Sequence, residues 1–245
     1  MNASAQCIVP DWPAPPPVKA LITTRHGGVS CGPFASLNLG SRTGDDPDAV
    51  RENRARLERL LPQAPKWLDQ QHGNTVVEAD ALDAPVAADA SIARRVGTVC
   101  AILIADCVPV LLTDRAATCV AAAHAGWRGV ASGVLEKTVE CMGVGPQDLL
   151  AYLGPGIGPD AFEVGPEVRE AFLRRDPGAQ EAFRPLREGK WLADLFQLAR
   201  RALVRTGVTA VYGGGRCTVS DPTRFYSYRR DRTTGRMAAL IWRAR

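Results

Sequence analysis

Short apolar runs, each bounded by turn residues or acids, recur along most of the chain. Their length and their small or β-branched residues are typical of buried strands rather than helices. They predict strands in the segments VKALITT (18–24), NTVVEAD (74–80), TVCAILIADC (98–107), VPVLLTD (108–114), TCVAAAHA (118–125) and LLAYLG (149–154). The C-terminal segment 224–242 alternates on both sides of an RTTG turn, which predicts a β-hairpin.

Helical patterns lie between these runs. Residues 45–61 combine Asp46 as a cap, Pro47 at the first helical position and apolar residues on one face, so we expect a helix there. Three more helices are expected at 130–142, 166–175 and 192–206. Because no repeat or low-complexity linker is visible, the pattern predicts one α+β domain over 18–245, preceded by a loose, proline-rich lead-in at 1–17.

Composition places the chain among ordinary globular proteins, with 46% hydrophobic and 23% charged residues. Its seven cysteines are scattered without a CxxC pair, which favours the reducing cytoplasm. The N-terminus lacks the basic and apolar regions of a secretory signal. The most apolar stretch contains Asp106 and Pro109, so we expect no membrane-spanning helix.

Positive charge is concentrated at the C-terminal end of the chain. Residues 200–245 hold eleven arginines and two acidic residues. The whole chain contains 26 arginines and four lysines, so a preference for arginine over lysine is general in this sequence and only the clustering is informative. The cluster is compatible with an anionic ligand. No basic helix or aromatic-interleaved stripe accompanies it, and we expect no nucleic-acid binding.

Three candidate metal ligands stand at boundaries of the predicted elements. His72 follows WLDQQ, Cys107 follows AILIAD and His124 ends CVAAAH. Two imidazoles and one thiolate suit zinc and leave a fourth position for water or substrate. The alternative is that Cys107 is simply a small buried residue, since the spacing matches no compact zinc motif.

Several segments together resemble one family, the YfiH-like proteins, described as laccase-domain or polyphenol oxidase proteins and as purine nucleoside phosphorylases. The resemblance runs from about residue 20 to the C-terminus. The matching segments are TTRHGGVS, SLNLG with GDDPDAVRENRARL, WLDQQHGNTVV, ADCVPVLLTD, HAGWRG, YLGPGIGPDAFEVG and SYRRDRTTGRMAALIW.

The resemblance implies a single layered α/β/β/α domain with mixed sheets and zinc held at strand ends by His72, Cys107 and His124. It also implies phosphorolysis of adenosine, inosine and methylthioadenosine to the free base and ribose 1-phosphate, with adenosine deamination alongside. The expected partners are a purine nucleoside and phosphate, and the expected assembly is a monomer or homodimer. Three histidines cannot supply the roughly ten imidazoles of a multicopper oxidase, but copper could occupy the same site and give weak oxidase activity.

Arginines are the candidate phosphate ligands, because a guanidinium binds phosphate through paired hydrogen bonds. The arginine of the family motif falls on Arg25, between a predicted strand and two glycines. Arg229 and Arg230 are further candidates, with surface ion pairs as the alternative for both.

Four other residues are candidates for substrate contact or proton transfer. Asn38 could hydrogen-bond the nucleoside or simply form a turn. Asp106, Glu163 and His26 are candidate general acids or bases, and Asp106, next to a ligand, could orient rather than react.

Two rival functions remain open. Cys107 could be a thiolate nucleophile with His124 or His72 as its base, in an amidohydrolase that edits a peptidoglycan precursor. Alternatively, zinc could be purely structural, with Cys100 or Cys119 as the fourth ligand.

Overall fold

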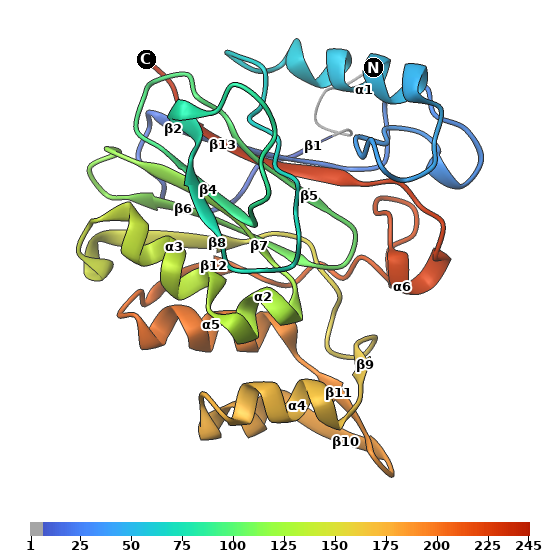
Figure 1. The fold of residues 1–245 in the computed structure, drawn as a ribbon, viewed down its shortest axis with the longest axis vertical. Helices are drawn as coiled ribbons and strands as arrows, with labels where there is room; N and C mark the ends of the chain where they lie inside the picture. Colours follow the sequence, from blue (N-terminus) through green and yellow to red (C-terminus); the bar gives the residue numbers. More distant parts are fainter. Residues whose placement is uncertain (1–6) are drawn as a thin grey trace.

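Two stacked β-sheets with helices on both outer sides make up most of the structure, a computed structural model that describes residues 7–245 (Figure 1). Residues 1–6 of the expected lead-in lie outside the described residues. Within these limits the fold is mixed α+β and contains three sheets, which confirms the predicted α+β class. None of the described helices has both the length and the apolar character needed to cross a bilayer.

The first sheet is antiparallel and joins distant parts of the chain. Its order is β1 (Cys7–Ile8), β2 (Val18–Thr23), β13 (Met237–Arg243) and β5 (Cys100–Ile104). On its outer side lies α1 (Pro47–Glu58) (Figure 1), which starts as predicted with the Asp46 side chain accepting from the Asp48 N–H. Leu57 of this helix packs with Ala101 and Leu240 of the sheet.

The second sheet has six strands and mixes both orientations. Its order is β12 (Ala210–Gly213), β8 (Leu149–Leu153), β6 (Val108–Asp114), β7 (Val120–Ala125), β4 (Ala90–Ala93) and β3 (Val76–Glu78). The end pairs β12·β8 and β3·β4 are parallel, and the other pairs are antiparallel. Strands β6 and β7 are buried along their whole length, because β5 and β13 pack on one face and helices on the other.

Three helices cover the outer face of the six-stranded sheet (Figure 1): α2 (Trp127–Ser132), α3 (Val134–Met142) and α5 (Leu195–Arg205). The sequence predicted one helix over 130–142. The structure has two, because Gly133 adopts a left-handed conformation with φ +94° that ends α2 before α3 begins.

A smaller lobe projects beyond α5 (Figure 1). It contains α4 (Pro166–Leu173) and the third sheet, in the order β10 (Phe183–Arg187), β11 (Lys190–Ala193) and β9 (Glu163–Val164). Apart from a short α-helix near the C-terminus, the remaining helical elements of residues 7–245 are 3-10 turns: η2 (Gly32–Phe34), η3 (Ala79–Ala81), η4 (Pro146–Asp148) and η5 (Pro177–Ala182).

The predicted C-terminal hairpin is wrong. Ser227 caps a short helix, α6 (Tyr228–Asp231), by accepting a hydrogen bond from the Arg230 N–H. Only β13 follows it as a strand, and that strand pairs with β2 and β5 instead of an adjacent partner. The alternation in 224–242 therefore reflects one central strand and a capped turn.

Candidate metal centre

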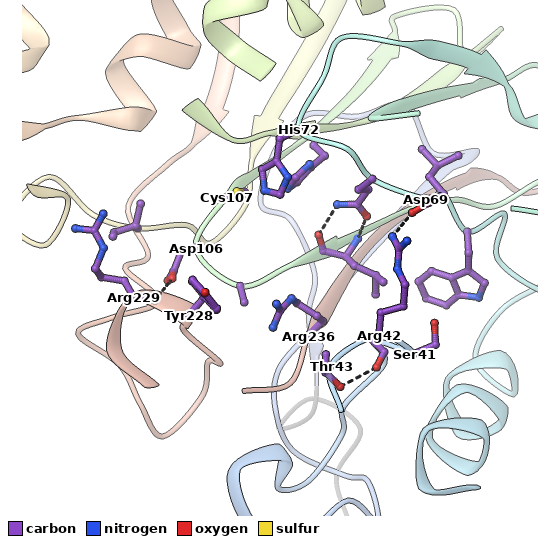
Figure 2. Close-up of a pocket in the computed structure, with 18 of the residues that line it drawn as sticks. Ser41, Arg42, Thr43, Asp69, His72, Asp106, Cys107, Tyr228, Arg229 and Arg236 are labelled. Carbon is purple, nitrogen blue, oxygen red and sulfur yellow. Dashed lines mark hydrogen bonds and ion pairs between the residues drawn. The ribbon is translucent and has the colours of Figure 1, made fainter. Parts of the chain in front are cut away.

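Three side chains from distant parts of the chain meet where the two large sheets connect. Cys107 lies between β5 and β6, His124 lies in β7, and His72 lies in the loop before β3. The candidate ligand atoms all lie within 4.8 Å of one another (Figure 2). The convergence predicted from the sequence is therefore present.

Sheet register brings Cys107 and His124 together. In the antiparallel pair β6·β7, Val108 is opposite Ala125 and Pro109 is opposite His124, so Cys107 lies just beyond the paired end. Two non-glycine residues here have positive φ, Asp106 at +94° and His72 at +60°. Such conformations cost energy and persist where the surroundings hold them in place, often at functional sites.

Gly126 makes room for the cluster. A Cβ atom at this position would lie 2.8 Å from Cys107 Sγ and 3.2 Å from His72 Cδ2. Any larger residue would therefore displace two of the three candidate ligands.

Asp89, 1% exposed, joins the two histidine segments. Its Oδ1 lies 2.9 Å from His124 Nδ1 and accepts the His72 backbone N–H at 2.8 Å. Its Oδ2 accepts the backbone N–H groups of Gly73 at 2.7 Å and Gln71 at 3.1 Å. A carboxylate only accepts, so His124 carries a proton on Nδ1, and Nε2 is the ring nitrogen that could bind a metal.

The cluster stabilises a thiolate. Burial raises the pKa of the Cys107 thiol, but His124 and His72 outweigh burial and lower it to about 6. Burial lowers the pKa of His124, while the Cys107 thiolate and Asp89 raise it to about 9. Burial likewise raises the pKa of the Asp89 carboxyl, but its donors, His124 first among them, bring it below its ordinary value.

These donors fit a transition-metal ion. Tetrahedral zinc bonds of about 2.0–2.3 Å place neighbouring ligand atoms roughly 3.3–3.8 Å apart, a separation that falls within the 4.8 Å limit on the spacing of this group. A thiolate with two imidazoles is a donor set that zinc and copper share. Neither Cys100 nor Cys119 belongs to the group found among the described residues.

The cluster opens into a pocket of about 840 Å³. One part of its wall is apolar and aromatic, formed by Trp127, Ile157, Phe162 and Leu195. Five arginines also line it: Arg42, Arg54, Arg229, Arg232 and Arg236. The lining carboxylates are Asp69, which pairs with Arg42, and Asp106, so the pocket is cationic (Figure 2).

Two further sequence candidates line this pocket. Asp106 accepts from the Thr218 hydroxyl at 2.6 Å through Oδ1. Its Oδ2 accepts the Arg229 backbone N–H at 2.7 Å (Figure 2). The Arg229 guanidinium donates to the carbonyl of Glu163 at 3.0 Å. Asp106 thus links the ligand loop to α6.

The other candidates lie outside the pocket lining. Arg25 donates to the carbonyls of Ala35 and Pro222, and its neighbour His26 is exposed. Asn38 is fully buried and bonds to the Asp45 carboxylate at 2.9 Å.

Arg230 and Glu163 are engaged elsewhere. Arg230 pairs with Asp231 and donates to the carbonyls of Thr218 and Phe225. Glu163 pairs with Arg187 on the small lobe. Direct roles for these two residues, and for Arg25, His26 and Asn38, stay predictions.

Sequence reasoning missed Asp89 and Arg236. Asp89 stands before a short strand in AADAS, and Arg236 was one of many C-terminal arginines. No local pattern distinguishes either residue, because each acquires its role only through partners far away in the chain.

Known proteins match this chain over almost its whole length. Residues 19–244 match a family model described as multi-copper polyphenol oxidoreductase laccase. A Pseudomonas aeruginosa protein named purine nucleoside phosphorylase is 57% identical over 96% of this chain and 97% of its own length. Purine nucleoside phosphorylase YfiH of Escherichia coli is 54% identical over 97% of this chain and 99% of its own length.

Solved structures share the whole fold. A Neisseria meningitidis protein superposes with a TM-score of 0.95 at 52% identity, covering 98% of this chain and all (100%) of its own. YlmD from Geobacillus stearothermophilus superposes with a TM-score of 0.92 at 33% identity, covering 100% of this chain and 98% of its own.

Proposed function

The chain belongs to the YfiH-like family, whose family model is described as multi-copper polyphenol oxidoreductase laccase, and we propose that it is a zinc-dependent purine nucleoside phosphorylase. Its proposed substrates are adenosine, inosine and methylthioadenosine together with phosphate, with adenosine deamination as a side activity. The catalytic unit is a single domain, residues 18–245. The observation that carries the proposal is the opening of the His72–Cys107–His124 cluster into a pocket with five arginines.

Phosphorolysis makes three demands on a site. A phosphate oxygen forms a bond to the anomeric carbon of the ribose, the N-glycosidic bond breaks, and the purine leaves with the bonding electrons and takes up a proton. The site must therefore hold an anion, orient the sugar and stabilise the departing base. The cationic wall and the aromatic wall of the pocket match the first two demands.

His72, Cys107 and His124 would hold the metal. A divalent ion there supplies a Lewis acid for charge that develops on the purine or on an attacking water. Asp89 holds a proton of His124 on Nδ1, so that Nε2 is the nitrogen that would bind the metal. Both carboxylate oxygens of Asp106 accept hydrogen bonds, which favours a role in orienting the Cys107 loop and α6 over proton transfer.

Copper could enter the same three-ligand site and give weak polyphenol oxidation. The chain contains three histidines, whereas a multicopper centre needs about ten imidazoles. We therefore propose nucleoside chemistry as the function and oxidase activity as incidental.

Replacing one ligand tests the proposal. In Cys107→Ala, bound zinc and inosine phosphorolysis should both disappear, since the thiolate is the charged member of the donor set. Cys31→Ala, which removes an exposed cysteine outside the pocket, should keep both. A zinc-free Cys107→Ala protein that forms ribose 1-phosphate at the wild-type rate would refute the mechanism.

The Cys107 thiolate also favours a second candidate function, that of a cysteine amidohydrolase. A cysteine with a pKa of about 6 beside two imidazoles also has the form of a nucleophile in an amidohydrolase. Alkylation of Cys107 would inactivate either enzyme. Chelation separates them, because a cysteine hydrolase keeps its activity after the metal is removed.

A further inference from the structure

Arg236 is held rigidly at the wall of the pocket. Its backbone N–H donates to Asn38 Oδ1 at 2.8 Å, and its carbonyl accepts the Leu39 N–H at 3.0 Å. Its side chain packs over Gly40, where a Cβ atom would lie 2.8 Å from Arg236 Cγ. The buried Asn38 thus contributes to the pocket indirectly, by fixing the segment that carries Arg236.

The guanidinium of Arg236 faces the pocket beside Tyr228 (Figure 2), 6.0 Å from the centre of that ring. Its Nη1 donates to the carbonyls of Thr234 at 2.9 Å and Gly235 at 3.0 Å. Among residues 7–245, its Nε and Nη2 have no hydrogen-bond acceptor. The edge that can bind an anion with two parallel hydrogen bonds is therefore open.

Most of the other pocket arginines also have partners in the protein. Arg42 pairs with Asp69, Arg54 donates to the Leu39 carbonyl and stacks on Trp67, and Arg229 donates to the Glu163 carbonyl. Arg232 is exposed. Arg54 and Arg229 are half-buried and make no ion pair with a described carboxylate, as is true of Arg236. Arg236 is distinguished by its position, close enough to the cluster to interact with the charges of Cys107 and Asp106.

Partial burial without a carboxylate partner is unfavourable for a cation. Burial lowers the pKa of the Arg236 guanidinium, and the negative charges of Cys107 and Asp106 offset this only in part. Charged groups withdrawn from water are normally paired, so a half-buried guanidinium that lines a ligand pocket without a carboxylate partner points to a ligand of opposite charge.

We infer that Arg236 binds the phosphate co-substrate, through two parallel hydrogen bonds from its Nε–Nη2 edge. This inference rests on the proposed phosphorylase function for the identity of the anion. It places the phosphate in the same pocket as the metal cluster, whereas Arg25, the arginine of the family motif, lies outside that lining.

Calorimetric titration with inorganic phosphate tests the inference without turnover. In Arg236→Gln the dissociation constant for phosphate should rise about 10–100-fold, the value of a lost charged hydrogen-bond pair. In steady-state assays the phosphate KM should rise to a similar extent, while the inosine KM stays within about twofold. Arg184→Gln, which removes an exposed arginine on β10 outside the pocket, controls for net charge and should bind phosphate normally.

Arg236→Lys covers the case in which the glutamine variant does not fold. It keeps the stem and the charge but loses the planar edge, so it should bind phosphate less tightly than the wild type. The inference is overturned if either Arg236 variant binds phosphate as the wild type does, if Arg25→Gln causes the larger loss, or if the wild type does not bind phosphate.

The two proposals fail in different ways. If phosphate binds through Arg236 but no nucleoside yields ribose 1-phosphate, the anion site stands and the phosphorylase function falls. If ribose 1-phosphate forms with an unchanged phosphate KM in Arg236→Gln, the function stands and Arg236 is not the phosphate ligand.

Discussion

Asp89 Oδ1 lies 2.9 Å from His124 Nδ1, and the same carboxylate accepts three backbone N–H groups from the loop that carries His72. One side chain therefore orients the imidazole of β7 and positions the loop before β3. Both histidines of the candidate metal centre depend on it.

Replacing Asp89 by Asn should weaken zinc binding about 10–100-fold. All four groups that face the carboxylate are N–H donors, so an amide nitrogen must oppose at least one of them. If the amide nitrogen faces His124, the imidazole must move its proton to Nε2, where the metal would bind. Competition with a chromophoric chelator measures the change.

Asp114 provides a matched control. It is 2% exposed and accepts N–H groups from Thr118 and Cys119 and the Thr118 hydroxyl, at the far end of β6. Asp114→Asn should lose stability but keep wild-type zinc affinity. Equal zinc affinities for the two variants would show that Asp89 has only a structural role.

Gly126→Ala should reduce zinc content and lower turnover by about 10–100-fold, because ligand displacements of ~1 Å have effects of this size. The new methyl group would meet Cys107 and His72. Gly215→Ala is the control, since a Cβ atom there would have no atom within 4 Å beyond its own chain neighbours. Wild-type zinc content in Gly126→Ala would argue against the assigned ligands.

Removing zinc should abolish activity and leave the fold intact. The ligands lie at strand ends and in a loop, and the buried cores on both faces of the large sheet are formed by other residues. Zinc at about 1,000 times its dissociation constant should add about 4 kcal/mol to the free energy of unfolding. Circular dichroism of the chelated protein checks this, and an unfolded apo form would support a structural role for zinc.

The stability contributed by Asp114 should depend on pH. Burial raises the pKa of its carboxyl, but the N–H group of Cys119 and the donors of Thr118 outweigh burial and lower it. A lowered folded-state pKa contributes stability above the unfolded value of about 3.9, and this is lost as the pH falls through the folded value. Asp114→Asn should therefore cost about 1–3 kcal/mol at pH 7.

Urea unfolding of the wild type and Asp114→Asn at neutral and acidic pH measures that difference. It should shrink steadily below a pH of about 4. A difference that stays constant down to a pH of about 2 would contradict the lowered pKa.

Elements with local signals were predicted well. Asp46 and Pro47 specify the start of α1 within one turn, and the apolar runs at 108–114 and 118–125 became β6 and β7. The predicted hairpin at 224–242 failed because both partners of β13 are far away in sequence, in β5 and β2. Alternation reveals a strand but not its neighbour.

The sequence alone determined the mixed α+β class and the three residues His72, Cys107 and His124 as a candidate metal site. Only the tertiary structure decided which polar residues serve that site. Asp89 bonds to His124 and Arg236 lines the pocket, while Arg25 and Asn38 are not part of the pocket lining. The reason is physical. Caps and periodicity act over a few residues, whereas sheet register and packing between distant segments decide which side chains share one cavity.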